Sequence, residues 1–183
     1  MRTTTLLLTI AAAAGTLSLS AANVRIDLNG ISNGIVLQPG ESGGFSVRRA
    51  GWEEKEKQDK TLNLEKALAA DYQDYTFSFT AEKAGYISFT ICGNWAPDAA
   101  NRPYLLLDDV TVNGELLPNG DFEAQSADGK ITGWNMQGKP TLSNEAKSGS
   151  SAIRINHDNR IAQSLKVEPG KSYTVKFSAK ETK

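Results

Sequence analysis

Cysteine and histidine are nearly absent from this sequence of 183 residues, which contains one of each, Cys92 and His157. A single cysteine cannot form a disulfide within the chain, so the fold must depend on its apolar core. Cys92 lies in an alternating apolar segment, and we expect it to be buried. One histidine and one cysteine also exclude the clustered ligands of a zinc site.

The sequence also lacks the motifs of common catalytic sites. His157 lies in a turn-like segment beside Asp158, and no serine stands in a nucleophile elbow. A glycosidase would need only two carboxylates that meet in space, but it also needs a cleft that so short a chain is not expected to build. We therefore expect a protein that is not an enzyme.

An excess of charge of one sign is missing as well. The chain has 20 Lys and Arg against 21 Asp and Glu, which gives a net charge of −1. No basic cluster stands out, and this excludes the electrostatic footprint of a nucleic-acid-binding protein. The hydrophobic fraction of 39% is sufficient for a packed core.

Only one long apolar run is present, at the N-terminus. The stretch from Leu6 to Ala22 carries no charge, and it has a short apolar core followed by the small residues Ser20 to Ala22. This pattern predicts a secretory signal peptide, residues 1–22, cleaved after Ala22 or one residue earlier. A membrane anchor is the alternative, but Thr and Ser dilute the run. We expect a secreted, periplasmic or cell-envelope protein without a membrane span after cleavage.

Strands are predicted wherever apolar and polar residues alternate. The predicted strands cover residues 24–28, 44–49, 61–70, 75–81, 86–92, 104–112, 151–156, 160–167 and 172–180, with short candidates in 133–138 and 141–146. Segment 61–70 is ambiguous, since Leu62 and Leu64 alternate whereas Leu64 and Leu68 keep helical spacing; we favour a strand. The pattern as a whole predicts an all-β, antiparallel β-sandwich.

Two arrangements of these strands are compatible with the sequence. Pro39-Gly40 and Pro169-Gly170 stand in similar surroundings, which suggests a repeated strand order. The strand count favours a first module at 23–112 and a second, incomplete module at 115–183; a single permuted sandwich is the alternative. A half-sandwich would expose an edge, through which the second module would dock or self-associate.

A family resemblance is carried by three segments. These are LLLDDVTV (105–112), LLPNGDFE (116–123) followed by Gly133-Trp134, and IAQSLKVEPGKSYTVKFSAK (161–180). Together they resemble the secreted carbohydrate-binding modules of the family 4 and family 9 group. The resemblance implies a galactose-binding-like jelly roll that binds a polysaccharide or another glycan. It also implies that Trp134 packs in the core.

Candidate ligand-binding residues come from the requirements of sugar binding, which are flat aromatic faces and planar polar side chains. Trp95 lies in the polar loop 93–103, and Asn94, Arg102 and Tyr104 lie close to it in sequence. Trp52 opens a charged segment and is a second candidate. Loops of this kind often carry function, although either indole could instead anchor its loop by packing down.

The resemblance further implies a structural Ca²⁺ between the opening and closing strands of the module. Its ligands would be Glu123 and one of Asp108 or Asp109, with Asp121 a further candidate. The alternative is that these acids cap turns and face water. We thus expect a secreted, non-catalytic carbohydrate-binding protein; the alternative is a structural or adhesive jelly-roll unit of a secreted or envelope assembly that contacts protein.

Overall fold

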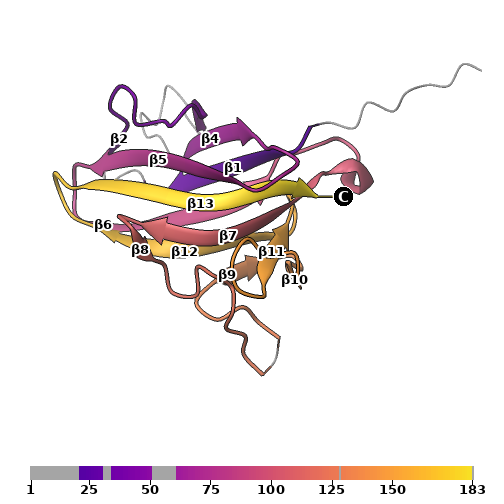
Figure 1. Ribbon diagram of the computed structural model, residues 1–183. Coiled ribbons are helices and arrows are strands. Elements are labelled where there is room, and N and C mark those ends of the chain that lie inside the picture. The colour runs from indigo at the N-terminus through magenta and orange to yellow at the C-terminus, as the bar shows by residue number, and fades with distance from the viewer. Residues whose placement is uncertain (1–20, 31–33, 51–60, 128, 183) are drawn as a thin grey trace, which may run out of the picture.

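Two antiparallel β-sheets pack face to face in this protein (Figure 1). The computed structural model describes residues 21–30, 34–50, 61–127 and 129–182. In sheet order, the first sheet contains β3 (Ser46–Ala50), β4 (Thr61–Ala67), β1 (Asn23–Asn29), β6 (Gly85–Gly93), β12 (Arg160–Val167) and β9 (Asn135–Gln137). The second contains β10 (Thr141–Ser143), β11 (Ala152–Ile155), β7 (Tyr104–Val112), β13 (Ser172–Thr182), β5 (Gln73–Ala81) and β2 (Ile35–Val36), and β8 (Glu115–Leu116) pairs with β7. The predicted all-β sandwich is confirmed, and its arrangement is jelly-roll-like.

The ambiguous segment 61–70 is a strand over most of its length, as predicted. It forms β4, which pairs with β1 and β3, and both Leu62 and Leu64 are fully buried. The helical spacing between Leu64 and Leu68 does not indicate a helix, because β4 ends at Ala67 and Leu68 lies beyond it. Pairing on both sides therefore decides the conformation of a segment whose own pattern is compatible with two periods.

The core lies between the sheets and is rich in phenylalanine. Phe77 and Phe79 of β5, Phe89 of β6 and Phe177 of β13 are fully buried, and the ring of Phe45 meets that of Phe77 edge-on at 5.7 Å. Full burial of one such side chain contributes roughly 1.5–3 kcal/mol. This core holds the sheets together in a chain without a disulfide among its described residues.

Two further residues are buried as predicted. Trp134 packs against Phe122 at 5.5 Å between ring centroids, and its indole N–H donates to the backbone oxygen of Asn119 at 2.9 Å. Cys92 is also buried, but it points to the outer side of the first sheet, as Ser88 and Thr90 do. Burial raises the pKa of the Cys92 thiol to about 12, so the thiol stays protonated at neutral pH.

The expected division into separate modules at 23–112 and 115–183 is wrong. β13 lies between β5 and β7, and β12 lies between β6 and β9, so the second stretch completes both sheets of the first (Figure 1). One core cluster contains residues of both stretches. Because β12 and β13 are each paired on both sides, the open edge expected for docking or self-association through a half-sandwich does not arise.

Two of the predictions fall largely on residues outside the described ranges. The signal peptide is one, since only Ala21 and Ala22 of its 22 residues are described, and Trp52 is the other. Ala22 is buried, and its backbone oxygen accepts a hydrogen bond from the amide of Leu68 at 2.9 Å. No helix in the described part of the chain is long and apolar enough to cross a membrane.

Candidate functional site

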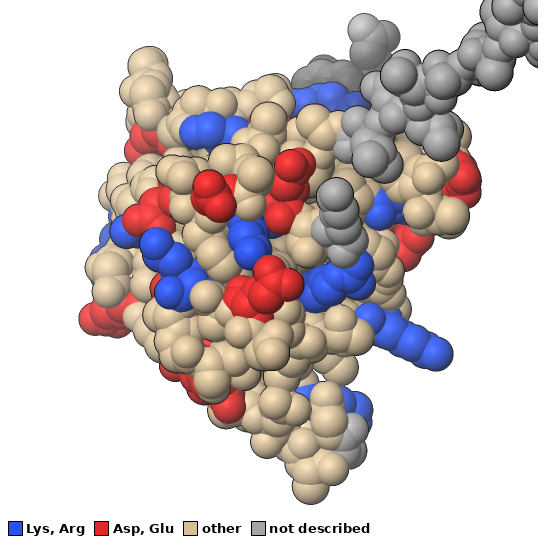
Figure 2. All heavy atoms as spheres, turned by 45° about the vertical axis from the view of Figure 1, so that its right-hand side comes forward, with Lys and Arg blue, Asp and Glu red and all other residues tan. Residues whose placement is uncertain are grey.

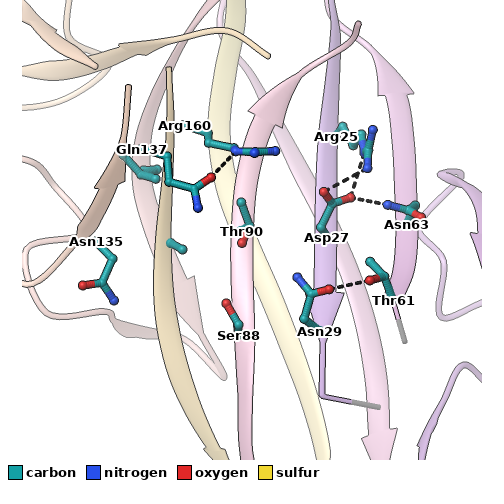
Figure 3. Close-up of a pocket in the computed structure, with 12 residues that line it drawn as sticks. Arg25, Asp27, Asn29, Thr61, Asn63, Ser88, Thr90, Asn135, Gln137 and Arg160 are labelled. Atoms are coloured by element: carbon teal, nitrogen blue, oxygen red, sulfur yellow. Dashed lines mark hydrogen bonds and ion pairs between the residues drawn. The ribbon is translucent and has the colours of Figure 1, made fainter. Parts of the chain in front are cut away.

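A polar groove crosses the outer face of the first sheet and encloses about 470 Å³ (Figure 3). Its residues come from five neighbouring strands and are mostly amides, hydroxyls and two arginines. They are Arg25, Asp27, Asn29, Thr61, Asn63, Ser88, Thr90, Asn135, Gln137, Arg160, Ile161 and Ala162. We call this set the sheet groove. Its volume lies in the range of small-molecule sites, about 300–1,000 Å³.

Strand register explains why these side chains meet. Asn63 pairs with Asp27, Asp27 with Thr90, Thr90 with Ala162, and Ala162 with Asn135. Residues paired in this way point to the same face of a sheet, so the five form one row across it. This row is the axis of the groove.

Side-chain length explains why the surface is hollow there. The two central strands, β6 and β12, present the short side chains of Ser88, Thr90 and Ala162. Longer side chains stand on both sides: Figure 3 shows Asn135 and Gln137 on one side of Ser88 and Thr90, and Asn29, Asp27 and Asn63 on the other. Short residues at the centre thus form the floor, and amides form the walls.

Arg25, Asp27 and Asn63 form one wall of the sheet groove. The Arg25 Nε and NH2 groups donate to the two carboxylate oxygens of Asp27 at 2.7 and 3.0 Å, and the Asn63 amide also donates to Asp27. Burial alone would lower the pKa of Arg25, but the hydrogen bonds and charge of Asp27 outweigh it and raise that pKa. The Asp27 carboxylate thus offsets the charge of Arg25.

One polar atom of this wall has no partner. The Asn63 side chain is buried, and its Oδ1 accepts no hydrogen bond among the described residues. The Asn63 amide nitrogen must face Asp27, which only accepts, so Oδ1 points the other way. An unpaired buried acceptor is uncommon in a folded protein. Because this oxygen is out of contact with solvent, it is not a group that the groove presents to a ligand.

The side-chain amide of the neighbouring Asn29 makes one structural hydrogen bond and presents its other end to the groove. Its Oδ1 accepts a hydrogen bond from the hydroxyl of Thr61, and its amide nitrogen points toward the groove (Figure 3). The wall on this side therefore offers a hydrogen-bond donor from Asn29.

The opposite wall contains Arg160 and Gln137. The Arg160 Nε–H donates to Oε1 of Gln137, and the guanidinium extends over β6 toward Thr90 (Figure 3). Arg160 makes no ion pair with a described residue. The groove thus holds one arginine that is neutralised by a carboxylate and one that is not.

An exposed aromatic side chain lies on the same face, beyond Ser88. Tyr86 is 67% exposed and alternates with Ser88 and Thr90 along β6, so it points to the side of the groove. Two residues along a strand span about 7 Å. Tyr86 therefore offers a flat ring close to one margin of the groove.

The predicted loop residues lie at a different place, a second hollow of about 960 Å³. Arg102 and Tyr104 line this hollow, whereas Trp95 and Asn94 do not. Trp95 is 57% exposed, so its ring is accessible, but neither hollow includes it. Asn94 is buried, and its Oδ1 accepts a hydrogen bond from the backbone amide of Asn23 at 3.0 Å, which fixes the start of β1.

Contacts inside the second hollow occupy most of its polar groups. Arg102 pairs with Asp158, Lys180 pairs with Glu145 at 2.8 Å, and the Arg154 guanidinium lies 3.5 Å from the centre of the Tyr104 ring. One face of Tyr104 is therefore covered. On the side of the molecule seen in Figure 2, basic and acidic side chains are likewise interspersed.

The acids predicted as calcium ligands face hydrogen-bond donors instead. Asp108 is fully buried and accepts from the backbone amides of Asp109, Lys147 and Ser148 at 2.8, 2.8 and 3.1 Å. Burial raises its pKa, although these bonds act in the opposite direction. The Asp109 carboxylate accepts from the Ser148 hydroxyl at 2.6 Å.

Glu123 has the same kind of surroundings. Its carboxylate accepts from the backbone amides of Ser150 and Ser151, both at 2.8 Å, and from the Ser150 hydroxyl. Among the described residues no three His, Cys, Asp or Glu side chains, Asp121 included, gather as for a metal ion. The calcium ion that the resemblance implies stays a prediction, and the hydrogen bonds of Asp108 and Glu123 anchor the loop 144–151.

The sheet groove was missed because its residues are distant in sequence. Asn63, Thr90 and Asn135 are brought together only by strand order, which alternation does not give. A usable signal was present, however: the outward positions of β1 and β6 carry Arg25, Asp27, Asn29, Ser88 and Thr90, with two charges and an amide on a single strand. Such residues on central strands indicate a solvated and functional outer face.

Comparison with known proteins assigns no function. Residues 115–183 match the model of a family described as "Protein of unknown function (DUF642)". The matched stretch includes Asn135, Gln137 and Arg160 of the sheet groove, and the loop anchor Glu123. Searches of curated proteins and of solved structures give no significant match.

Proposed function

We propose that this protein binds a glycan in the sheet groove without cleaving it. The observation that carries the proposal is the row of amide and hydroxyl side chains across five strands, with short residues at its centre. Sugar hydroxyls both donate and accept hydrogen bonds, so a sugar-binding groove needs donors and acceptors among its side chains. Asn29 offers a donor, and the hydroxyls of Ser88 and Thr90 can both donate and accept.

The exposed aromatic ring of Tyr86 supports the same proposal. A pyranose presents one apolar C–H face, which packs on a flat ring while its hydroxyls remain hydrogen-bonded. Tyr86 stands on the groove side of β6 and is accessible. We therefore assign to Tyr86 the stacking role that the sequence suggested for the loop tryptophans.

Binding without catalysis agrees with the groove's lining. Hydrolysis of a glycosidic bond by the usual mechanism uses two carboxyl groups about 5–9.5 Å apart. Among the lining residues Asp27 carries the only carboxylate, and it is held by Arg25 and Asn63. The proposed role is recognition.

The proposed setting is outside the cytoplasm. The uncharged run from Leu6 to Ala22 supports export, and the resemblance of segments 105–112, 116–123 and 161–180 to secreted carbohydrate-binding modules supports a glycan as the partner. We propose a secreted or envelope-associated carbohydrate-binding protein.

A pair of matched substitutions tests this proposal. Thr90→Trp places an indole on the groove floor, whereas Thr76→Trp makes the same change on the outer face of the second sheet. On a panel of soluble and insoluble polysaccharides, the wild type and Thr76→Trp should bind alike. Thr90→Trp should lose affinity at least about tenfold at an unchanged Tm, because the indole occupies the ligand's place.

The same panel gives the contradicting results. Equal binding by both variants would move the site elsewhere on the molecule, and the absence of binding by the wild type to every polysaccharide would overturn the proposed function.

A further inference from the structure

The two arginines of the sheet groove differ in their charge environment. Arg25 donates through Nε and NH2 to both oxygens of Asp27, which uses one edge of its guanidinium and cancels its charge. Arg160 donates through Nε to the side-chain oxygen of Gln137, a neutral amide. An amide orients a guanidinium without neutralising it.

The contact with Gln137 also determines which edge of the Arg160 guanidinium remains available to a ligand. A guanidinium can meet a carboxylate through Nε and one terminal nitrogen, or end-on through its two terminal nitrogens. Because the Nε–H of Arg160 is used by Gln137, the end-on pair remains, and it extends over the groove floor near Thr90 (Figure 3). Two parallel N–H groups match the two oxygens of a planar carboxylate.

Among the described residues, none around Arg160 compensates this charge. Cys92 lies on the neighbouring strand between Arg160 and Arg25, and its thiol is protonated at neutral pH. Thr90 and Ala162 are neutral, and Asp27, the carboxylate of the lining, is bound to Arg25. Summed over its lining residues, two arginines against one aspartate, the groove carries a charge of +1.

From this geometry we infer that the glycan bound in the sheet groove contains a uronic acid, whose carboxylate is held end-on by Arg160 while Asn29 binds a sugar hydroxyl. The inference rests on the proposed function and names its ligand class. A sulfate ester carries the same sign of charge, but it spreads one charge over three oxygens, so each oxygen is a weaker hydrogen-bond acceptor than a carboxylate oxygen.

Binding of three polysaccharides to the protein tests the inference: a polyuronate, the same polymer after reduction of its carboxyl groups to alcohols, and a sulfated neutral polysaccharide. The wild type should bind the polyuronate at least about tenfold more tightly than the reduced polymer, as expected for a charge-assisted hydrogen-bonded pair. It should also prefer the polyuronate to the sulfated polymer.

Variants separate the role of Arg160 from general charge. Gln137→Glu places a carboxylate against Arg160 and should remove the preference for the polyuronate while leaving binding of the reduced polymer intact. Arg160→Lys keeps the charge and loses the fork, and it should reduce the preference. Lys147→Gln removes an exposed positive charge from the loop 144–151, which is attached to β7 of the second sheet and lies outside the groove lining, and it should change neither.

Each failure has a distinct meaning. Equal binding of the polyuronate and its reduced form, or equal binding of the sulfated polymer, would overturn the uronate inference and leave glycan binding in place. Failure of all three and of the wider panel would overturn the proposed function itself.

Discussion

Single carboxylates in this protein serve mainly to position backbone. Glu123 binds the amides of Ser150 and Ser151, and Asp108 binds those of Lys147 and Ser148, so two acids hold one loop against the sandwich. The sequence identified these acids as important but assigned them to calcium. It could not show that the groups facing them are N–H donors, because the loop comes 25 or more residues later in the chain.

The hydrogen bonds of Glu123 predict a dependence of stability on pH. The contacts with Ser150 and Ser151 hold the pKa of Glu123 below its usual value of 4.5. The unfolded chain therefore takes up a proton at Glu123 first, and stability falls as pH drops below about 4.5. Asp74, Asp158 and Glu168 also have lowered pKa values and act in the same direction.

Urea unfolding between pH 3 and 7 measures this dependence. Glu123→Gln should flatten the loss of stability at low pH, whereas Glu115→Gln, at an exposed residue of β8, should leave it as in the wild type. An identical slope for all three proteins would refute the anchoring role of Glu123.

Among whole elements, β9 is placed by an unusually close turn. Gly138 follows β9 with φ of +72°, and a Cβ at this position would lie 2.4 Å from the backbone oxygen of Asp158. The next amide, that of Lys139, donates to Asn159 Oδ1 at 2.7 Å. The sequence predicted a short strand at 133–138, but its position beside Arg160 depends on this contact with a distant turn.

A comparison of two glycine variants tests the placement of β9. Gly138→Ala introduces both a left-handed alanine and the clash with Asp158, whereas Gly170→Ala, at φ of +73° with no atom within 4 Å, introduces the conformational strain alone. Both should lose about 1–2 kcal/mol from strain. Gly138→Ala should lose more, and it should weaken glycan binding because Gln137 moves with β9. Equal losses in the two variants would show that the close contact has no structural weight.

At the scale of the whole molecule, the chain forms one sandwich, and strands from its first and second halves lie next to each other in both sheets. The alternation of apolar and polar residues located most strands, because this pattern is contained within each segment and does not depend on its partners. Strand order depends on partners far apart in the chain, such as Phe79 with Tyr173, and repeated turn motifs gave no information about it. For this reason the sequence predicted the fold class, offered the single unit only as the alternative, and did not predict the groove that the shared sheet creates.

Separate expression of the two halves tests this architecture. Residues 23–114 lack β12 and β13, and residues 115–183 lack β6, a partner of β12, and both partners of β13, β5 and β7. Each fragment alone should lack a cooperative thermal transition and dispersed amide signals, because β5, β6 and β7 would each have an unpaired edge and an exposed apolar face. A cooperative transition in either fragment would support two independent modules.

The central claim, that the outer face of the first sheet is the ligand site, is tested most directly by amide NMR of the whole protein during titration with an oligosaccharide that it binds. We predict that the largest shift changes fall on Asn29, Ser88, Thr90, Asn135 and Arg160, with little change around Trp95 and Tyr104. Changes confined to residues 93–104, with the amides of β1, β6, β9 and β12 unmoved, would contradict it.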